Sequence, residues 1–241
     1  MSGPATARAR RNLHGRRHGH RLRARQRDLL TRHLPALEID LAPDGGAIDP
    51  RTLFDRPVDE IWLEVGFGAG EHLIAQAIAH PDHGMIGCEP FINGVARLVA
   101  ACHDRGVANV RVFVDDARLL LEALPAACLS RVFVLFPDPW PKRRHHKRRF
   151  VSAPAVAELA RVLADGGTLR VATDHGEFCR WTLFHVLADG AFAWTARSAS
   201  DWRSRDEGTP PTRYERKATA AGRASIHLCF ARRARRRPAP K

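Results

Sequence analysis

The amino-acid sequence predicts an α/β fold, a mostly parallel sheet with helices on both faces. From Glu60 onward, short apolar runs alternate with helix-length segments, which is the pattern of βαβ units. A glycine-rich turn follows the first apolar run, and acidic residues follow the next two. Because ligands of such sheets collect at the carboxyl ends of the strands, these polar residues indicate where a site would form.

The apolar runs and the segments between them place the individual elements. Strands are expected over residues 61–65, 85–88, 111–114, 131–136, 168–172, 191–196 and 225–231. Helices are expected over residues 28–41, 71–79, 92–105, 118–124, 154–163 and 177–188. Asp165, Gly166 and Gly167 are expected to end the fifth of these helices, because glycine readily adopts the left-handed cap conformation.

The chain length of 241 residues fits one catalytic domain with terminal extensions. We divide it into a basic arm over residues 1–27, a helix and linker over 28–59, the main domain over 60–231 and a basic tail over 232–241. The arm contains few apolar residues and cannot bury enough surface to offset the entropy of ordering. We therefore expect it to be mobile until an anionic partner binds it.

Positive charge is the most unusual feature of the composition. The chain has 39 Lys and Arg against 26 Asp and Glu, a formal net charge of +13, which favours a polyanionic partner. A genome that is biased toward arginine codons would produce part of this excess. The clustering favours function, because residues 8–27 contain no acid and residues 142–149 are all basic or histidine.

The cysteines and the apolar runs exclude several classes of protein. The five cysteines are scattered and odd in number, which favours neither a zinc site nor a disulfide framework. The basic N-terminus lacks the apolar stretch of a signal peptide, and no run approaches membrane-spanning length. We expect a soluble, cytoplasmic protein with no metal ion and no membrane segment.

A glycine-rich turn, Glu-Val-Gly-Phe-Gly-Ala-Gly at residues 64–70, joins the first predicted strand to a helix. Glycines there allow the backbone to approach a ligand closely. The dinucleotide-binding pattern would place its third glycine at position 71, where this chain has Glu71, so a nicotinamide enzyme is disfavoured. Glu64 would repel a pyrophosphate and instead suits a cationic or amino-acid ligand.

Carboxylates end the next two predicted strands. Glu89 stands where nucleotide-binding α/β folds use a carboxylate to bind both ribose hydroxyls, and Asp115 and Asp116 stand where an adenine amino group could be held. Each alone is commonly a turn or helix cap. Together with the glycine turn, they indicate a nucleoside ligand.

The fourth predicted strand ends in Phe-Pro-Asp-Pro-Trp-Pro-Lys at residues 136–142, where prolines stiffen the backbone and exclude a helix. Asp138 and Trp140 could hydrogen-bond the edge of an extruded nucleobase and stack on its face. The alternative is a structural proline-rich turn with a partly buried tryptophan. The position opposite the predicted nucleoside favours a site, and the basic run that follows suits RNA phosphates.

These motifs resemble the class I S-adenosylmethionine-dependent methyltransferases and, among them, the bacterial tRNA (guanine-N7-)-methyltransferase family. The specific match lies in residues 64–70, 87–90, 136–142, 146–149, 172–174 and 212–215, and it spans about residues 60–230. The resemblance implies a Rossmann-like, seven-stranded, mostly parallel sheet whose last strand is antiparallel. Departures are Pro141, where the family commonly has another residue, and the C-terminal basic tail.

The resemblance also implies roles for individual residues. It implies that the S-adenosyl-L-methionine cofactor is bound by Glu64, Gly66, Gly68, Gly70, Glu89, Asp116 and Asp138. It implies substrate contacts at Lys142, Asp174, Thr212, Arg213, Tyr214 and Glu215. The charge pattern adds expected RNA phosphate contacts at Arg143, Arg144, Lys147, Arg148 and Arg149.

The implied reaction is methyl transfer to N7 of a guanine in tRNA, by resemblance at position 46 of the variable loop, with Asp138 as the catalytic residue. Two alternatives stay open. The chain could methylate another RNA or a small molecule, or it could be an RNA-binding protein with a vestigial cofactor pocket. The partner is expected to be tRNA, and the chain to be a monomer or a homodimer.

Overall fold

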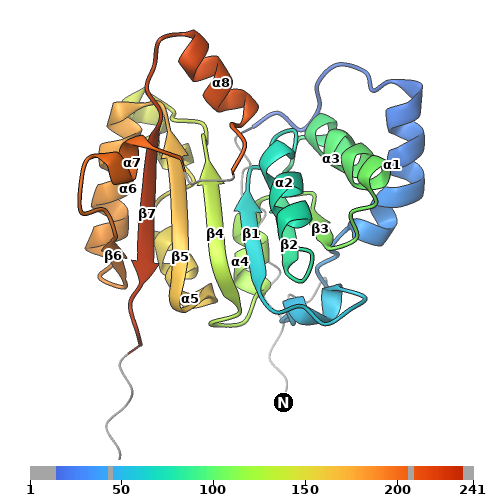
Figure 1. Ribbon diagram of the computed structural model, residues 1–241, viewed down its shortest axis with the longest axis horizontal. Helices are drawn as coiled ribbons and strands as arrows, with labels where there is room; N and C mark the ends of the chain where they lie inside the picture. The colour runs from blue at the N-terminus through green and yellow to red at the C-terminus, as the bar shows by residue number, and fades with distance from the viewer. Residues whose placement is uncertain (1–14, 43–45, 206–208, 236–241) are drawn as a thin grey trace, which may run out of the picture.

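A seven-stranded sheet with the order β3-β2-β1-β4-β5-β7-β6 forms the centre of the molecule. The computed structural model describes residues 15–42, 46–205 and 209–235 (Figure 1). Neighbouring strands from β3 to β5 are parallel, and β7 runs antiparallel to both β5 and β6. The fold class is therefore confirmed, including the antiparallel last strand.

The elements alternate along the chain as the sequence predicts. The strands are β1 Ile61–Val65, β2 Gly84–Cys88, β3 Val110–Phe113, β4 Leu129–Leu135, β5 Leu163–Thr173, β6 Phe192–Trp194 and β7 Ile226–Arg232. The α-helices are α1 Ala24–Leu37, α2 Glu71–Ala79, α3 Ile92–Arg105, α4 Ala117–Ala123, α5 Ala153–Val162, α6 Gly176–Ala188, α7 Ser200–Arg203 and α8 Arg213–Ala220. Two 3₁₀ helices lie at Pro50–Leu53 and Arg143–Arg148.

The first helix begins earlier than predicted. It covers Ala24–Leu37 instead of residues 28–41, so it starts inside the segment that was assigned to the basic arm. The Gln26 side chain accepts a hydrogen bond from the Arg23 backbone N–H at 3.1 Å and caps the helix. Hydrophobic periodicity could not detect this first turn, because its residues are polar or small. Residues 1–14 of the predicted arm lie outside the described residues.

The glycines after α5 do not cap that helix, so this prediction is wrong. The α5 helix ends at Val162, and β5 begins at Leu163 and continues through Asp165, Gly166 and Gly167. Gly166 has a φ of +80°, at an irregularity in the pairing of β4 with β5. The left-handed conformation of Gly166 therefore allows a bulge in β5 and does not end a helix.

Two apolar layers cover the sheet. On one face, Trp62, Leu73, Val95 and Leu98 belong to a buried cluster that joins β1 to α1, α2 and α3. On the other face, Leu63 belongs to a larger cluster with residues of α4, α5 and α6. Alternate residues of β1 thus face opposite layers. The helices cover both faces of the sheet, so the end of the sheet formed by the carboxyl ends of the parallel strands stays open, and we call it the open edge.

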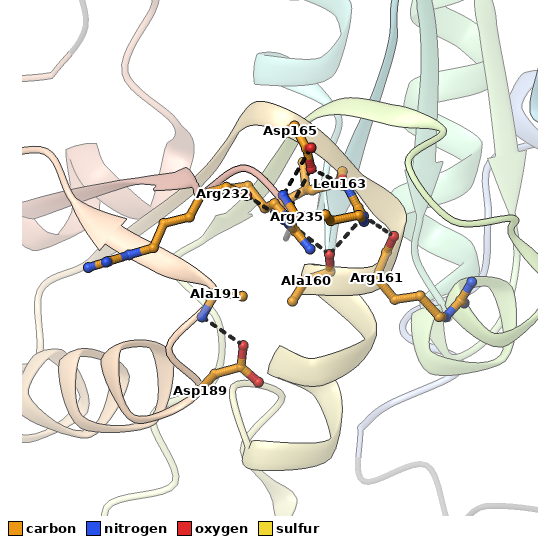
Figure 2. A network of polar contacts seen from close by, with 9 residues as sticks. Ala160, Arg161, Leu163, Asp165, Asp189, Ala191, Arg232 and Arg235 are labelled. Carbon is orange, nitrogen blue, oxygen red and sulfur yellow. Dashed lines mark hydrogen bonds and ion pairs between the residues drawn. The ribbon is translucent and has the colours of Figure 1, made fainter. Parts of the chain in front are cut away.

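The C-terminal arginines are joined to the domain, as Figure 2 shows. Arg235 donates through Nη2 to the carbonyl oxygens of Leu163 and Arg161, both at 2.8 Å, and it also pairs with Asp165. Arg232 belongs to β7 and donates to Asp165 at 3.1 Å. The segment from Arg232 to Arg235, expected to be part of a separate tail, therefore satisfies carbonyl groups at the end of α5. Residues 236–241 lie outside the described residues.

Replacement of Arg235 by alanine should destabilise the fold without changing the site. The Arg235→Ala variant loses the hydrogen bonds to Arg161 and Leu163 and the ion pair with Asp165, which lowers the free energy of unfolding by about 1–3 kcal/mol. Urea unfolding measures this change. The exposed Arg197, whose side chain makes no hydrogen bond or ion pair with another described residue, gives a matched Arg197→Ala control that should change stability by less than about 0.5 kcal/mol. Equal stability of both variants would contradict the prediction.

Candidate active site

A cavity of about 530 Å³ opens at the carboxyl ends of β1, β2, β3 and β4. Its walls combine the glycine turn, three strand-end loops, part of the N-terminal segment and one residue of α8. Its lining residues include Gly15, Arg16, Gly66, Gly68, Glu89, Asp115, Asp116, Arg118, Phe136, Asp138, Trp140, Arg148 and Tyr214. The structure therefore brings together two of the three glycines and four of the carboxylates that the sequence indicated.

The glycine turn has the backbone that only glycine adopts easily. Gly66, Gly68 and Gly70 have φ angles of +72°, +59° and +79°. A Cβ atom at Gly66 would meet no atom within 4 Å, because this position faces open space. Gly70 caps α2 and packs against Leu98 instead of lining the cavity. Two of the three predicted glycines thus border the cavity, and the third supports the turn.

Glu89 holds the glycine turn and the start of α3. Its Oε2 accepts a hydrogen bond from the Gly68 N–H at 2.8 Å, and its Oε1 accepts from the Phe91 N–H at 3.0 Å. Burial raises the pKa of Glu89, and these two backbone hydrogen bonds oppose that shift. Each carboxylate oxygen keeps accepting capacity toward the cavity, where ribose hydroxyls would donate.

The two aspartates after β3 already have cationic partners. Asp116 caps α4 and pairs with Arg118, whose Nη2 lies 2.6 Å from Oδ2. Asp115 pairs with Arg17 of the N-terminal segment at 2.8 Å. Both line the cavity, so Asp115 is an additional candidate that the position-by-position carry-over from the family did not include.

The N-terminal segment closes one side of the cavity. Gly15 and Arg16 line it, and the Arg17 carbonyl oxygen accepts from the Ile92 N–H at 3.0 Å. Further along, Asn93 accepts from the Gly19 N–H at 2.8 Å. The sequence had assigned this segment to RNA binding alone, because nothing in it signals a contact with α3.

The loop after β4 presents Asp138 to the cavity in a strained backbone. Phe136 and Trp140 have φ angles of +50° and +41°, which side chains with a Cβ rarely adopt. Asp138 lies between them, and its carboxylate has no hydrogen-bond or ion-pair partner within the part of the chain that the structure describes. Desolvation by the cavity walls raises the pKa of Asp138. An unpaired carboxylate in a nucleoside-sized cavity is suited to a ligand.

Trp140 contacts two side chains of the basic run, Arg148 and His145. The Arg148 guanidinium lies 4.9 Å from the Trp140 ring centroid, and the His145 ring meets it edge-on at 5.7 Å. Arg148, expected to contact phosphate, thus lines the cavity and stacks on the tryptophan. The prolines alone do not fix this ring.

The residues from Thr212 to Glu215 divide between two cavities. Tyr214 lines the large cavity, and its ring would lie 3.1 Å from a Cβ at Gly68. Thr212 and Glu215 line a smaller cavity of about 60 Å³ behind Phe136, which borders both spaces. Thr212 accepts from the Glu215 N–H at 3.1 Å and begins α8. The helical period separates these side chains, and the sequence had not predicted the helix.

The smaller cavity contains ionisable groups that are paired with each other. Glu215 pairs with Arg205 at 2.7 Å and lies 3.6 Å from His227. Desolvation lowers the pKa of His227, against the opposing effect of Glu215. Glu64 is buried in β1 and lies 2.7 Å from Nδ1 of His72, another residue of this cavity. Glu64 is therefore not a lining residue of the large cavity.

Three predicted substrate residues lie outside both cavities. Asp174 pairs with Arg223 at 2.7 Å, and Lys142 and Arg213 are exposed to solvent. They surround the open edge of the sheet rather than its interior.

The basic run after Lys142 is only partly a surface. Arg143, Arg144 and Lys147 are exposed on the 3₁₀ helix, as phosphate contacts require. Arg149 is fully buried instead and pairs with Glu177 at 2.9 Å. The expectation that Arg149 contacts phosphate is wrong, because its side chain is 0% exposed and is directed into the protein.

The cavity fits a cationic amino-acid nucleoside. It offers carboxylates for hydroxyl and amino donors, an open backbone at Gly66 and a free carboxylate at Asp138. No group of three or more His, Cys, Asp or Glu side chains within the described ranges could hold a metal ion. Among the helices that the structure describes, none has the length and apolar character needed to cross a membrane.

Comparisons with known proteins show the family of this chain. A family model described as a putative methyltransferase matches residues 59–228. A tRNA (guanine-N(7)-)-methyltransferase of Rhodospirillum rubrum is 53% identical over 225 residues, which cover 92% of this chain and 88% of that protein. The protein of the same name from Rhodopseudomonas palustris strain BisB18 is 48% identical over 231 residues, 95% of this chain and 91% of that one.

Solved structures share the fold at low identity. The 16S rRNA methyltransferase KamB is 16% identical with a TM-score of 0.54, covering 77% of this chain and 91% of that chain. The cyclase SpnF is 14% identical with a TM-score of 0.52, covering 74% and 76%. These likenesses confirm the fold alone, since one fold hosts many reactions. The matches over nearly the whole length show that the chain belongs to the tRNA (guanine-N(7)-)-methyltransferase family.

Proposed function

We propose that this protein transfers a methyl group from S-adenosyl-L-methionine to N7 of a guanine in tRNA, at position 46 of the variable loop. The observation that carries the proposal is the unpaired Asp138 carboxylate, which faces the cavity beside the glycine turn and the Glu89 and Asp116 carboxylates. The relatives that are about half identical carry the name of this activity.

The cofactor would lie along the walls of the large cavity. Glu89 would accept hydrogen bonds from the ribose, and Asp115 or Asp116 from the adenine amino group. Gly66 and Gly68 would border the methionine part, with Gly70 and Glu64 supporting that wall from behind. When bound, S-adenosyl-L-methionine supplies an activated methyl group on a sulfonium centre.

The acceptor atom determines what the protein must do. Guanine N7 has an in-plane lone pair and no proton, so no general base is required, and catalysis consists of alignment and electrostatics. The purine gains positive charge as it accepts the methyl group. Asp138 would stabilise that charge or hold the guanine edge. Phe136 separates the two cavities, so the base would enter beside this ring, near Thr212 and Glu215.

Transcripts that lack the acceptor atom test the function. A tRNA transcript made with 7-deazaguanine carries a C–H group in place of N7 and should accept no methyl group from labelled cofactor. The unmodified transcript should be methylated and should break at one guanine after aniline treatment, because 7-methylguanosine is labile. Transfer to the deaza transcript would instead indicate an exocyclic amine. Transfer only to ribosomal RNA, or none to any RNA, would support the alternative functions.

The exposed residues of the 3₁₀ helix are proposed as phosphate contacts. Replacing Arg143, Arg144 and Lys147 with glutamine should weaken tRNA binding and reduce the slope of log affinity against log salt by about two to three. Filter binding at several salt concentrations measures this slope. Affinity for S-adenosyl-L-methionine should not change. An unchanged salt slope would show that these three side chains do not contact phosphate and are only exposed to solvent.

Two further properties follow as proposals. A tRNA substrate places the protein in the cytoplasm. Whether it acts as a monomer or a homodimer is a prediction that sedimentation would decide.

A further inference from the structure

Among the residues that the structure describes, Arg149 is the largest fully buried side chain, and every other cation of its segment, residues 142–149, is at least partly exposed. A buried charge requires paired and hydrogen-bonded surroundings to offset its loss of hydration. Its Nη2 lies 2.9 Å from Oε1 of Glu177 at the start of α6. The guanidinium also lies 4.7 Å from the ring centroid of Trp181, which covers it. These contacts anchor the side chain from the α6 side.

On its other side, Arg149 holds the backbone of the loop that carries Asp138. Its Nε donates to the Pro139 carbonyl oxygen at 2.8 Å, and its Nη2 donates to the Trp140 carbonyl oxygen at 3.3 Å. Pro137, Pro139 and Pro141 have no N–H group, so this loop has few backbone donors for its own hydrogen bonds. Arg149 supplies donors from outside the loop.

The carbonyl that receives the second bond belongs to a strained residue. Trp140 has a φ of +41°, a conformation that persists only where surrounding contacts over-determine it. Asp138 is two residues away, and its carboxylate has no partner to fix it among the described residues. The direction of Asp138 therefore depends on the backbone that Arg149 holds.

We propose that Arg149 and Glu177 form a positioning pair, which holds the Pro139–Trp140 backbone so that Asp138 faces the reacting base, and that Arg149 contacts neither tRNA nor cofactor. This inference rests on the proposed function, because it gives Asp138 its role in methyl transfer. Glu177 lies in the first turn of α6, directly after the short loop that carries Asp174, so the pair joins the loop after β4 to the start of α6. The hydrogen bond from Arg149 lowers the pKa of Glu177, which keeps this carboxylate ionised.

Single-turnover rates of three variants test the pair. The Arg149→Lys variant keeps the charge, but one ammonium group cannot reproduce the planar fork, and the rate should fall by about 100-fold. The Michaelis constant for tRNA and the salt slope of binding should stay unchanged. If Arg149 acts through Asp138, the double variant Asp138→Asn with Arg149→Lys should be no slower than Asp138→Asn alone. A merely structural role would give effects that multiply.

A matched control uses another arginine with the same kind of partners. Arg161 donates to the carbonyl oxygens of Leu121 and Leu124 at 2.6 and 2.7 Å and pairs with Glu158, at the end of α5 away from the site. The Arg161→Lys variant should lose stability and keep the wild-type rate. If Arg149→Lys does not fold, Arg149→Met with Glu177→Leu replaces the ion pair by apolar side chains of similar size. That double variant, folded by circular dichroism, should also be slow.

The possible failures are distinguishable. A near wild-type rate for Arg149→Lys, or for the folded apolar pair, together with a slow Asp138→Asn variant overturns this inference and leaves the proposed function intact. Multiplying effects, or a smaller salt slope for the folded apolar pair, in which the cation is removed, also overturn it. A wild-type rate for Asp138→Asn removes the role proposed for Asp138 and this inference with it.

Discussion

The Asp138→Asn variant is expected to transfer methyl groups roughly 100-fold more slowly than the wild type, or slower still, in single-turnover experiments. Asparagine preserves the shape of the side chain and removes the charge that would face the developing positive charge of the purine. Rapid mixing of a preformed cofactor complex with tRNA measures the rate. The exposed Asp189 beyond α6 provides a control, because Asp189→Asn should react at the wild-type rate. Equal rates for both variants would contradict the assignment.

The pH dependence of the reaction should also show the requirement for an ionised Asp138. Because desolvation raises the pKa of Asp138, this carboxylate becomes protonated at a higher pH than an ordinary aspartate. As pH falls through that raised pKa, kcat/KM should fall, because the protonated form carries no charge. The Asn variant should lack this acidic limb. If the fall in kcat/KM at low pH persists unchanged in the Asn variant, a group other than Asp138 causes it.

The second large effect is expected at a glycine that the sequence did not single out. Gly94 lies in α3, and a Cβ at this position would stand 2.1 Å from the carbonyl oxygen of Gly68. Helix α3 and the glycine turn must separate to accept a methyl group there, which disturbs the hydrogen bond between Gly68 and Glu89. The Gly94→Ala variant should bind S-adenosyl-L-methionine roughly tenfold more weakly or worse and lose about 1–3 kcal/mol of stability.

Isothermal titration with the cofactor and thermal unfolding measure these two changes. Gly176 is the matched control, because a Cβ there would meet no atom within 4 Å and its φ is not positive. The Gly176→Ala variant should bind cofactor normally and be as stable as the wild type, or more stable by up to about 1 kcal/mol. Normal cofactor affinity in Gly94→Ala would show that the turn and α3 move independently.

The main domain was predictable because hydrophobic periodicity and glycine chemistry are local. The bounds of β1, α2 and α3 agree with the prediction to the residue. The failures involve partners that are distant in sequence. Arg149 was expected at the surface because the charge run contains nothing that distinguishes it, and only its packing against Glu177 and Trp181 buries it.

The site itself was predictable as a set of strand ends but not as a set of contacts. Glu64 was expected to face the cofactor, yet it is buried and paired with His72, outside the lining of the large cavity. The separation of Tyr214 from Glu215 follows from α8, whose short polar sequence has no apolar period to reveal it. The N-terminal wall at Gly15 and Arg16 has no sequence signal either, since the residues that follow them bond to Ile92, Asn93 and Asp115, which are distant in sequence.

The reversed direction of β7 decides which end of that strand serves the reaction. The last residues of the parallel strands lie at the open edge of the sheet. Because β7 is antiparallel, its first residues lie there instead, and His227 is paired with Ala172 near the end of β5. Helix α8 directly precedes this strand and is seen in Figure 1 at the edge toward which the parallel strands point. Arg232 consequently emerges at the opposite edge. An affinity tag fused beyond it starts far from the reacting groups, whereas an insertion between Ala220 and Ile226 would displace them.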